Sequence, residues 1–171
     1  IPLIDDVKVM LELLSSLGVK VQLNNHSVTL NASEIKSTSL DELLCSKVRT
    51  SILLAGPLSA RHGSATIFPP GGDVIGKRRL DTHFHGLKSL GIEITINESY
   101  QFEAKNLKGC DIILDEASVT ATENIMMAAV LADGHTTIYN AACEPHVQDL
   151  ALLLNSMGAD IAGIGTNRLH I

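Results

Sequence analysis

The chain has 171 residues, of which 45% are apolar and 3% aromatic, and its 13 basic and 19 acidic residues give a formal net charge of −6. The apolar fraction is too high for a disordered chain, and the acidic balance argues against a nucleic-acid partner, although it leaves room for a site that binds one small anion. No apolar run approaches the ~20 residues that a bilayer span needs, so we expect no membrane segment.

The first residues and the cysteines indicate the origin of the chain. It begins Ile1-Pro2 without Met and has no signal-peptide pattern, so we expect a piece of a longer protein. Its three cysteines, Cys45, Cys110 and Cys143, include no CxxC pair. An odd number of thiols is typical of a reducing compartment, which predicts a cytoplasmic protein. Each thiol lies near an element end without an adjacent base, so we interpret all three as structural.

The predicted elements alternate between helices and short strands, and a glycine follows most of the helices. Glycine there can adopt the left-handed backbone that ends a helix, and alternating apolar residues indicate the strands. Asparagines at Asn24-Asn25 and Asn97-Glu98 indicate hairpin turns. In chain order, we expect a helix before Gly18, strands 19–23 and 27–30, a helix over 48–60 before Gly63, strand 64–68, a helix near 80–90 before Gly91, strands 92–96 and 100–104, a buried strand at 111–114, a helix over 118–132 before Gly134, strand 135–139, and a helix from 144 that ends before Gly158.

This order of elements repeats at intervals of about 70 residues. The repeat predicts units of approximately 1–70, 71–141 and 142–171, of which the third is partial. The alternation indicates an α/β (α+β) fold with mixed sheets around helices gathered in the middle. A doubly wound sheet with βαβ crossovers does not fit, because no GxGxxG follows a strand.

The segment between strand 64–68 and the next helix carries the densest set of polar residues. It begins Pro69-Pro70-Gly71-Gly72-Asp73 and continues to Lys77-Arg78-Arg79 beside the helix start. Guanidinium groups and helix-end N–H groups suit phosphates and carboxylates, so one interpretation is a site for an anionic ligand. The other interpretation, of equal weight, is a solvated turn whose cations face water.

Two helix starts occupy corresponding positions in the repeat. Thr120 and Glu123 have the spacing of a capping box, so a structural cap is sufficient to explain them. Arg49 lies at the other start, where a cation opposes the helix dipole. Ligand contact and a structural role are equally open for Arg49. We expect no metal site, because His83 and His85 lie on different faces of a helix and no HExxH or CxxC is present.

Together these motifs resemble the UDP-N-acetylglucosamine 1-carboxyvinyltransferases, a family of enolpyruvyl transferases, over the whole chain. The residues that carry the resemblance are Val48-Arg49-Thr50-Ser51, Gly56-Pro57-Leu58, Ala60-Arg61-His62-Gly63, Pro70-Gly71-Gly72-Asp73-Val74-Ile75-Gly76-Lys77-Arg78, Asp81-Thr82-His83, Ser118-Val119-Thr120-Ala121-Thr122-Glu123-Asn124, and Asn140-Ala141-Ala142 before Glu144-Pro145.

The resemblance implies a fold and a reaction. Each of the family's two domains is an inside-out α/β barrel of three repeated units around buried helices, and this chain would be most of the loop-bearing domain. Its partner would be the missing second domain of the same chain, without which the piece is expected to be inactive. The reaction moves the enolpyruvyl group of phosphoenolpyruvate to the 3′-hydroxyl of UDP-N-acetylglucosamine with release of phosphate, the first committed step of peptidoglycan synthesis. No cofactor and no metal is implied.

The resemblance also implies roles for particular residues. Asp73 would be the general acid that protonates the methylene carbon of phosphoenolpyruvate, Arg78 would meet that substrate as the loop closes, and Arg49 would contact bound substrate. Two segments would hold the UDP-sugar, and they comprise Arg78, Arg79, Leu80, Asp81, Thr82 and His83 together with Glu116, Ala117, Ser118, Val119 and Thr120.

The chain departs from the family pattern at several positions. Most members have Cys at the position of Asp73. A carboxyl group of raised pKa can also deliver the proton. It cannot form the thioether that the epoxide fosfomycin makes with a Cys, so we predict intrinsic resistance to fosfomycin. The other departures are Arg79 for Pro, Thr120 for Gly, Cys143 for Arg and His146 for Glu. Two alternatives stay open: the related transferase that acts on shikimate 3-phosphate, and a catalytically silent paralogue that binds a UDP-sugar or a partner protein.

Overall fold

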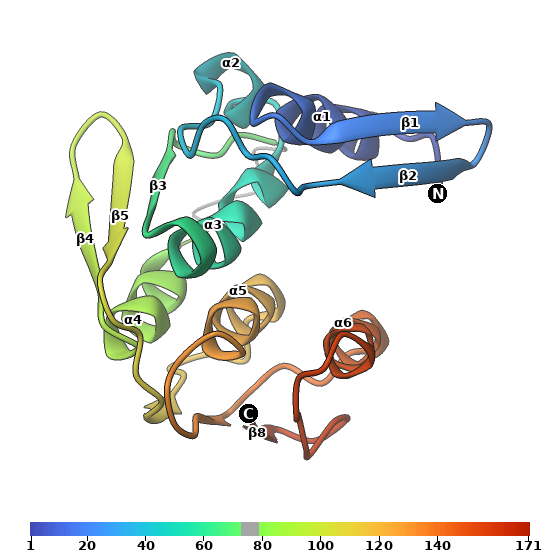
Figure 1. The fold of residues 1–171 in the computed structure, drawn as a ribbon. Coiled ribbons are helices and arrows are strands. Elements are labelled where there is room, and N and C mark those ends of the chain that lie inside the picture. The colour runs from blue at the N-terminus through green and yellow to red at the C-terminus, as the bar shows by residue number, and fades with distance from the viewer. Residues whose placement is uncertain (73–78) are drawn as a thin grey trace.

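A computed structural model of the chain describes residues 1–72 and 79–171 (Figure 1). Within these residues, the helices are α1 (Asp5–Ser16), α2 (Glu42–Cys45), the 3-10 helix η1 (Arg49–Leu54), α3 (Ala55–His62), α4 (Asp81–Ser89), α5 (Val119–Ala129) and α6 (Pro145–Ser156). The strands are β1 (Lys20–Asn24), β2 (Ser27–Asn31), β3 (Ser64–Ile67), β4 (Ile92–Ile96), β5 (Tyr100–Ala104), β6 (Asp111–Ile113), β7 (Thr137–Tyr139) and β8 (Arg168–His170).

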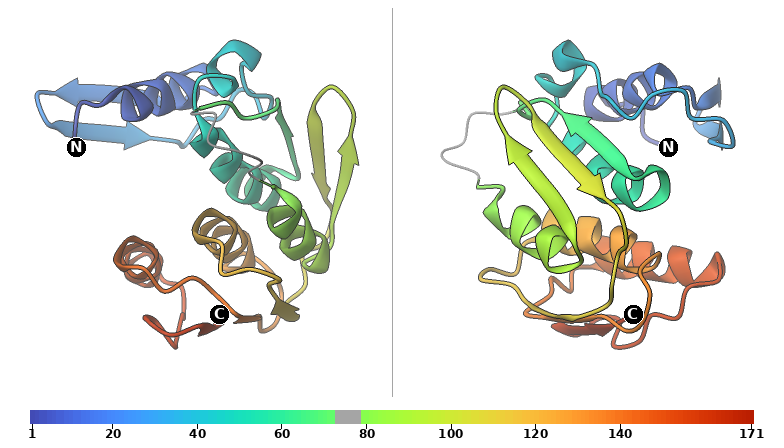
Figure 2. Two further views of the ribbon diagram at one scale, coloured as in Figure 1. Left: turned by 180° about the vertical axis from the view of Figure 1, so that it is seen from behind. Right: turned by 60° about the vertical axis from the view of Figure 1, so that its left-hand side comes forward.

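The described strands form three small sheets that lie outside the helices (Figures 1 and 2). β1 and β2 form an antiparallel hairpin, and β5 pairs antiparallel with both β3 and β4. In the third sheet β7 pairs parallel with β6 and antiparallel with β8, which makes this sheet mixed. The expected arrangement, with mixed sheets around gathered helices, is therefore confirmed.

One strand connection differs from the expectation from sequence. β6, α5 and β7 form a parallel βαβ unit, although we expected no crossovers of a doubly wound sheet. Parallel neighbours need a long crossover connection, which a helix supplies. A short parallel bridge also joins Ser39 and Thr66, and the connection between them contains α2, η1 and α3. No doubly wound sheet results, because antiparallel strands continue each sheet.

The core lies where the helices meet, with α5 packed against α3, α4 and α6 (Figure 1). Ile125, Met126 and Ala128 of α5 are fully buried. Two glycines allow the close approach of the neighbouring helices. A Cβ on Gly56 of α3 would lie 2.3 Å from the backbone oxygen of Asn124, and one on Gly86 of α4 would lie 2.1 Å from Cδ1 of Ile125.

The helix that we expected over 48–60 is two helices. η1 ends at Leu54, and α3 begins at Ala55. Pro57 accounts for the break, because its missing N–H is tolerated in the first turn of a helix but not in the interior of one that began near Arg49. Strand 111–114 is also less buried than expected: Ile112 is 1% exposed but Ile113 is 69% exposed, since successive side chains point to opposite faces.

Other expectations hold closely. The hairpin strands 92–96 and 100–104 have the predicted bounds, and all five glycines expected after helices have positive φ. The proposed division at 70 and 141 stays a prediction. No helix of the described residues is long and apolar enough to cross a bilayer.

Candidate active site

Arg49 lies between two cavities on the side of the helices that faces segment 69–72. The larger cavity, of about 380 Å³, is lined by Asp6, Ser46, Lys47, Arg49, Thr50, Gly72 and Thr120. The second, of about 300 Å³, is lined by Arg49, Pro69, Pro70, Leu80, Asp81, Phe84, Ile96 and Tyr100.

Segment 69–72 is fixed to the end of α2. The N–H of Gly71 donates to the carbonyl of Cys45 at 2.9 Å, and a Cβ on Gly71 would lie only 1.6 Å from the carbonyl oxygen of Ser46. Gly72 then has a φ of +91°, beside the backbone of Arg49. Glycines are therefore required here so that the backbone can pass close to Arg49. Asp73 and Arg78, the expected catalytic residues, lie outside the described residues.

Arg79 and Asp81 lie at the start of α4. Arg79 Nε donates to Asp81 Oδ2 at 2.6 Å, and its Nη2 lies 2.6 Å from the same oxygen. This hydrogen bond, with the negative charge of Asp81, raises the pKa of Arg79. Both side chains are more than half exposed, so the pair contributes little to stability. The carbonyl of Arg79 accepts a hydrogen bond from Arg49 Nη2 at 3.0 Å, which joins Arg49 to the segment before α4.

Thr82 connects α4 to the segment before α5. Its hydroxyl lies 2.8 Å from Asp115 Oδ1 and 3.3 Å from Glu116 Oε1, so it can donate to either carboxylate. The hydrogen bond from Thr82 lowers the pKa of Asp115, and the positive charge of Arg79 adds to the effect. The anionic form of Asp115 is therefore favoured close to the start of α4.

His83 lies beneath this surface and is 2% exposed. Its Nδ1 lies 3.1 Å from Nδ2 of Asn124, and its Nε2 lies 3.1 Å from Oγ1 of Thr120. Burial, with a smaller contribution from the positive charge of Arg49, lowers the pKa of His83 to about 4. The ring is therefore neutral at neutral pH, and its hydrogen bonds have defined directions.

Ser118 is the N-cap of α5, and its hydroxyl accepts from the N–H of Ala121 at 3.4 Å. The prediction that Thr120 and Glu123 form a capping box is wrong. Because α5 begins at Val119, Thr120 lies inside the first turn, and its hydroxyl meets His83 instead.

The structure thus brings most of the described candidate residues to one side of α4 and α5. Arg49 and Thr120 share the larger cavity, and Leu80 and Asp81 line the second. Sequence reasoning did not select Lys47, which also lines the larger cavity, or Asn124, which is 0% exposed. Asn124 belongs to the motif that carries the family resemblance, and an uncharged polar residue in the interior of an apolar helix was a further signal that could have identified it.

None of the three cysteines is among the residues that line the two cavities. Burial raises the pKa of Cys45 and of Cys110, which makes both poorer nucleophiles at neutral pH. The Sγ of Cys110 contacts the carbonyl of Ser89 at 3.2 Å. These contacts agree with a structural interpretation of the two residues.

Comparison with solved structures defines the fold of the chain. The enolpyruvyl transferase NikO from Streptomyces tendae matches 99% of this chain and 41% of its own, with a TM-score of 0.82 and 21% identity. EPSP synthase from Acinetobacter baumannii matches 96% of this chain and 38% of its own, with a TM-score of 0.72 and 21% identity. These likenesses establish an EPSP-synthase-like fold, as expected from the sequence.

The profile of the family EPSP synthase (3-phosphoshikimate 1-carboxyvinyltransferase) matches residues 1–171, and the chain belongs to this family. Among curated proteins it is similar to UDP-N-acetylglucosamine 1-carboxyvinyltransferase of Borrelia garinii (54% identity), Treponema pallidum (52%) and Bacteroides fragilis (49%). Each comparison covers the whole of this chain and 40%, 40% and 41% of the relative, respectively. The chain therefore spans about two-fifths of the length of these relatives, and the expected resemblance is confirmed.

Proposed function

We propose that the protein to which this chain belongs transfers the enolpyruvyl group of phosphoenolpyruvate to the 3′-hydroxyl of UDP-N-acetylglucosamine and releases phosphate. The single observation that carries the proposal is the larger cavity, in which Arg49 and Lys47 lie beside the first turn of α5. Cationic side chains and the N-terminus of a helix both favour phosphate oxygens. The identity of about 50% to the named relatives supports the choice of reaction.

The chemistry requires charge stabilisation and one proton donor. The sugar hydroxyl attacks C2 of phosphoenolpyruvate while C3 gains a proton, and the tetrahedral adduct then loses a C3 proton and phosphate. Arg49 lines the larger cavity, where its positive charge can balance the charge of a bound substrate. The role of Asp73 as the acid rests on the resemblance, because that residue lies outside the described residues.

UDP-N-acetylglucosamine is favoured over shikimate 3-phosphate as the acceptor. The named UDP-N-acetylglucosamine enzymes share 49–54% identity with this chain, whereas the EPSP synthase structure shares 21%. The departures at Arg79 and Thr120 keep the alternative of a silent paralogue open.

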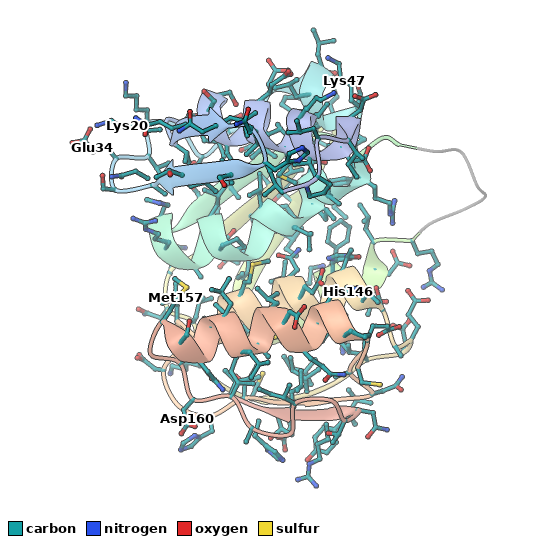
Figure 3. All side chains as sticks on the ribbon, turned by 90° about the vertical axis from the view of Figure 1, so that its right-hand side faces the viewer. Lys20, Glu34, Lys47, His146, Met157 and Asp160 are labelled. Atoms are coloured by element: carbon teal, nitrogen blue, oxygen red, sulfur yellow. The ribbon has the colours of Figure 1, made fainter. Side chains whose placement is uncertain are left out.

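We also propose that further parts of the same protein complete the active site. Three large apolar side chains of α6 and its C-cap are more than half exposed: Leu152, Leu153 and Met157. Figure 3 looks onto this helix, whose two ends are marked by His146 and Met157. The greater length of the relatives supports a partner for this face within the same protein.

The free thiols of Cys45, Cys110 and Cys143 support a cytoplasmic location.

The test is phosphate release by the full-length protein from phosphoenolpyruvate with either acceptor. Turnover is expected with UDP-N-acetylglucosamine and not with shikimate 3-phosphate. Asp73→Asn and Arg49→Ala are expected to lower kcat/KM at least about 100-fold, whereas Lys88→Ala, an exposed change on α4, is the matched control. Binding of the UDP-sugar without turnover by the wild type would instead support the silent paralogue.

A further inference from the structure

A chain of hydrogen bonds runs from the buried contact of α3 and α5 to the larger cavity. It begins at the backbone N–H of Gly56, which donates to Oδ1 of Asn124 at 2.7 Å. Nδ2 of Asn124 donates to the carbonyl of Ile52 at 2.9 Å and lies 3.1 Å from Nδ1 of His83. The opposite ring nitrogen of His83 meets the hydroxyl of Thr120 at 3.1 Å.

The chemistry of these groups fixes the direction of every donor. A backbone N–H can only donate and a carbonyl can only accept, so Gly56 and Ile52 together determine which amide atom of Asn124 is oxygen and which is nitrogen. Nδ2 must then donate to His83, and Nδ1 of the ring is an acceptor without a proton. The neutral ring carries its proton on Nε2, which donates to Oγ1 of Thr120.

This direction leaves the hydroxyl proton of Thr120 available for another acceptor. Among the described residues, His83 is the one side-chain partner of that hydroxyl. Thr120 lines the larger cavity together with Arg49 and Lys47. A substrate that occupies this cavity brings anionic oxygens, which are the preferred acceptors for such a donor.

We infer that Asn124 and His83 are positioning residues, which orient the hydroxyl of Thr120 so that it donates to a diphosphate oxygen of the nucleotide-sugar substrate. This inference rests on the proposed function for its ligand. The ring contributes no charge; its role is to prevent Thr120 from donating inward. The diphosphate is favoured over phosphoenolpyruvate because Thr120 lies in the first turn of α5, and the N–H groups of a first helical turn lack intrahelical acceptors and favour phosphate oxygens.

Steady-state kinetics of the full-length protein test the role of Thr120. Thr120→Val removes the donor with little change of shape, and it is expected to raise the KM for UDP-N-acetylglucosamine at least about tenfold while the KM for phosphoenolpyruvate changes less than about twofold. Thr120→Ser restores the hydroxyl and is expected to return the KM toward the wild-type value. Thr95→Val, at an exposed position of β4, is the matched control. Equal KM values for Thr120→Val and the wild type would overturn the inference without affecting the proposed function.

The direction of the relay has a separate readout. The ¹⁵N chemical shifts of His83 in the full-length protein are expected to show a protonated Nε2 and an unprotonated Nδ1. Asn124→Asp replaces the donor to Nδ1 with an acceptor, so in this variant the ¹⁵N shifts are expected to show a proton on Nδ1. A proton on Nδ1 in the wild type would overturn the inference. Since the ¹⁵N measurement needs no turnover, an inactive wild type with the expected shifts would refute the proposed function alone.

Discussion

The buried ring of His83 makes folding stability depend on pH in a way that can be calculated. The pKa of His83 falls from 6.5 to about 4 in the folded protein, because burial and the charge of Arg49 disfavour the protonated ring. The folded state therefore binds fewer protons than the unfolded state between these two values. Stability from this residue is fully present above pH 6.5 and is lost progressively as the pH falls to about 4.

The size of the effect follows from the shift itself. Each pKa unit corresponds to about 1.4 kcal/mol, so the shift amounts to about 3 kcal/mol in total, most of which is lost by pH 4.5. His83→Gln removes the titration and retains a neutral polar side chain. At pH 7 the variant is expected to be less stable than the wild type because it loses hydrogen bonds, and this difference is expected to shrink by about 2–3 kcal/mol at pH 4.5.

Urea unfolding of the full-length protein, followed by far-UV circular dichroism at pH 7 and pH 4.5, measures the difference. Glu123, whose pKa is raised by burial, is present in both proteins, so its contribution cancels. His85→Gln, on the exposed face of the same helix, is the control and is expected to show the pH dependence of the wild type. An equal loss of stability on acidification in the wild type and in His83→Gln would refute the reasoning.

Three further predictions concern the packing of the core and the residue at position 73. Gly56→Ala is expected to destabilise the protein by about 1–3 kcal/mol in thermal melts, because the new Cβ would lie 2.3 Å from the backbone oxygen of Asn124; His62→Ala, exposed on the same helix, is the control, and equal melting temperatures would contradict the close crossing. Phe102→Ala is expected to cost about 3–5 kcal/mol in urea unfolding, because this ring is 0% exposed; a loss below about 1 kcal/mol would show that the core repacks. Fosfomycin is expected to leave the full-length enzyme active and to inactivate an Asp73→Cys variant stoichiometrically, and rapid inactivation of the wild type would exclude the predicted resistance.

Much of the fold could be predicted from local signals. The hairpin of β4 and β5 has the predicted bounds because alternation and turn residues are both local features. The helix ends at Gly18, Gly91 and Gly158 were predictable for the same reason, since left-handed backbone has few alternatives to glycine. The Pro57 break was missed because apolar periodicity continues across it, although the proline itself marks a helix start.

The sequence by itself also determined the family resemblance and placed Arg49, Asp81 and Thr120 among the candidate residues. It could not determine the partners of Thr120, and the local capping-box spacing gave the wrong one. His83 and Asn124 are 41 residues apart, and they meet because Gly56 and Gly86 let α3 and α4 pack tightly against α5. Only that packing excludes water from the ring, lowers the pKa of His83 and brings its Nε2 to the Thr120 hydroxyl. Burial and hydrogen-bond direction depend on groups from separate elements, so the tertiary structure alone decided them.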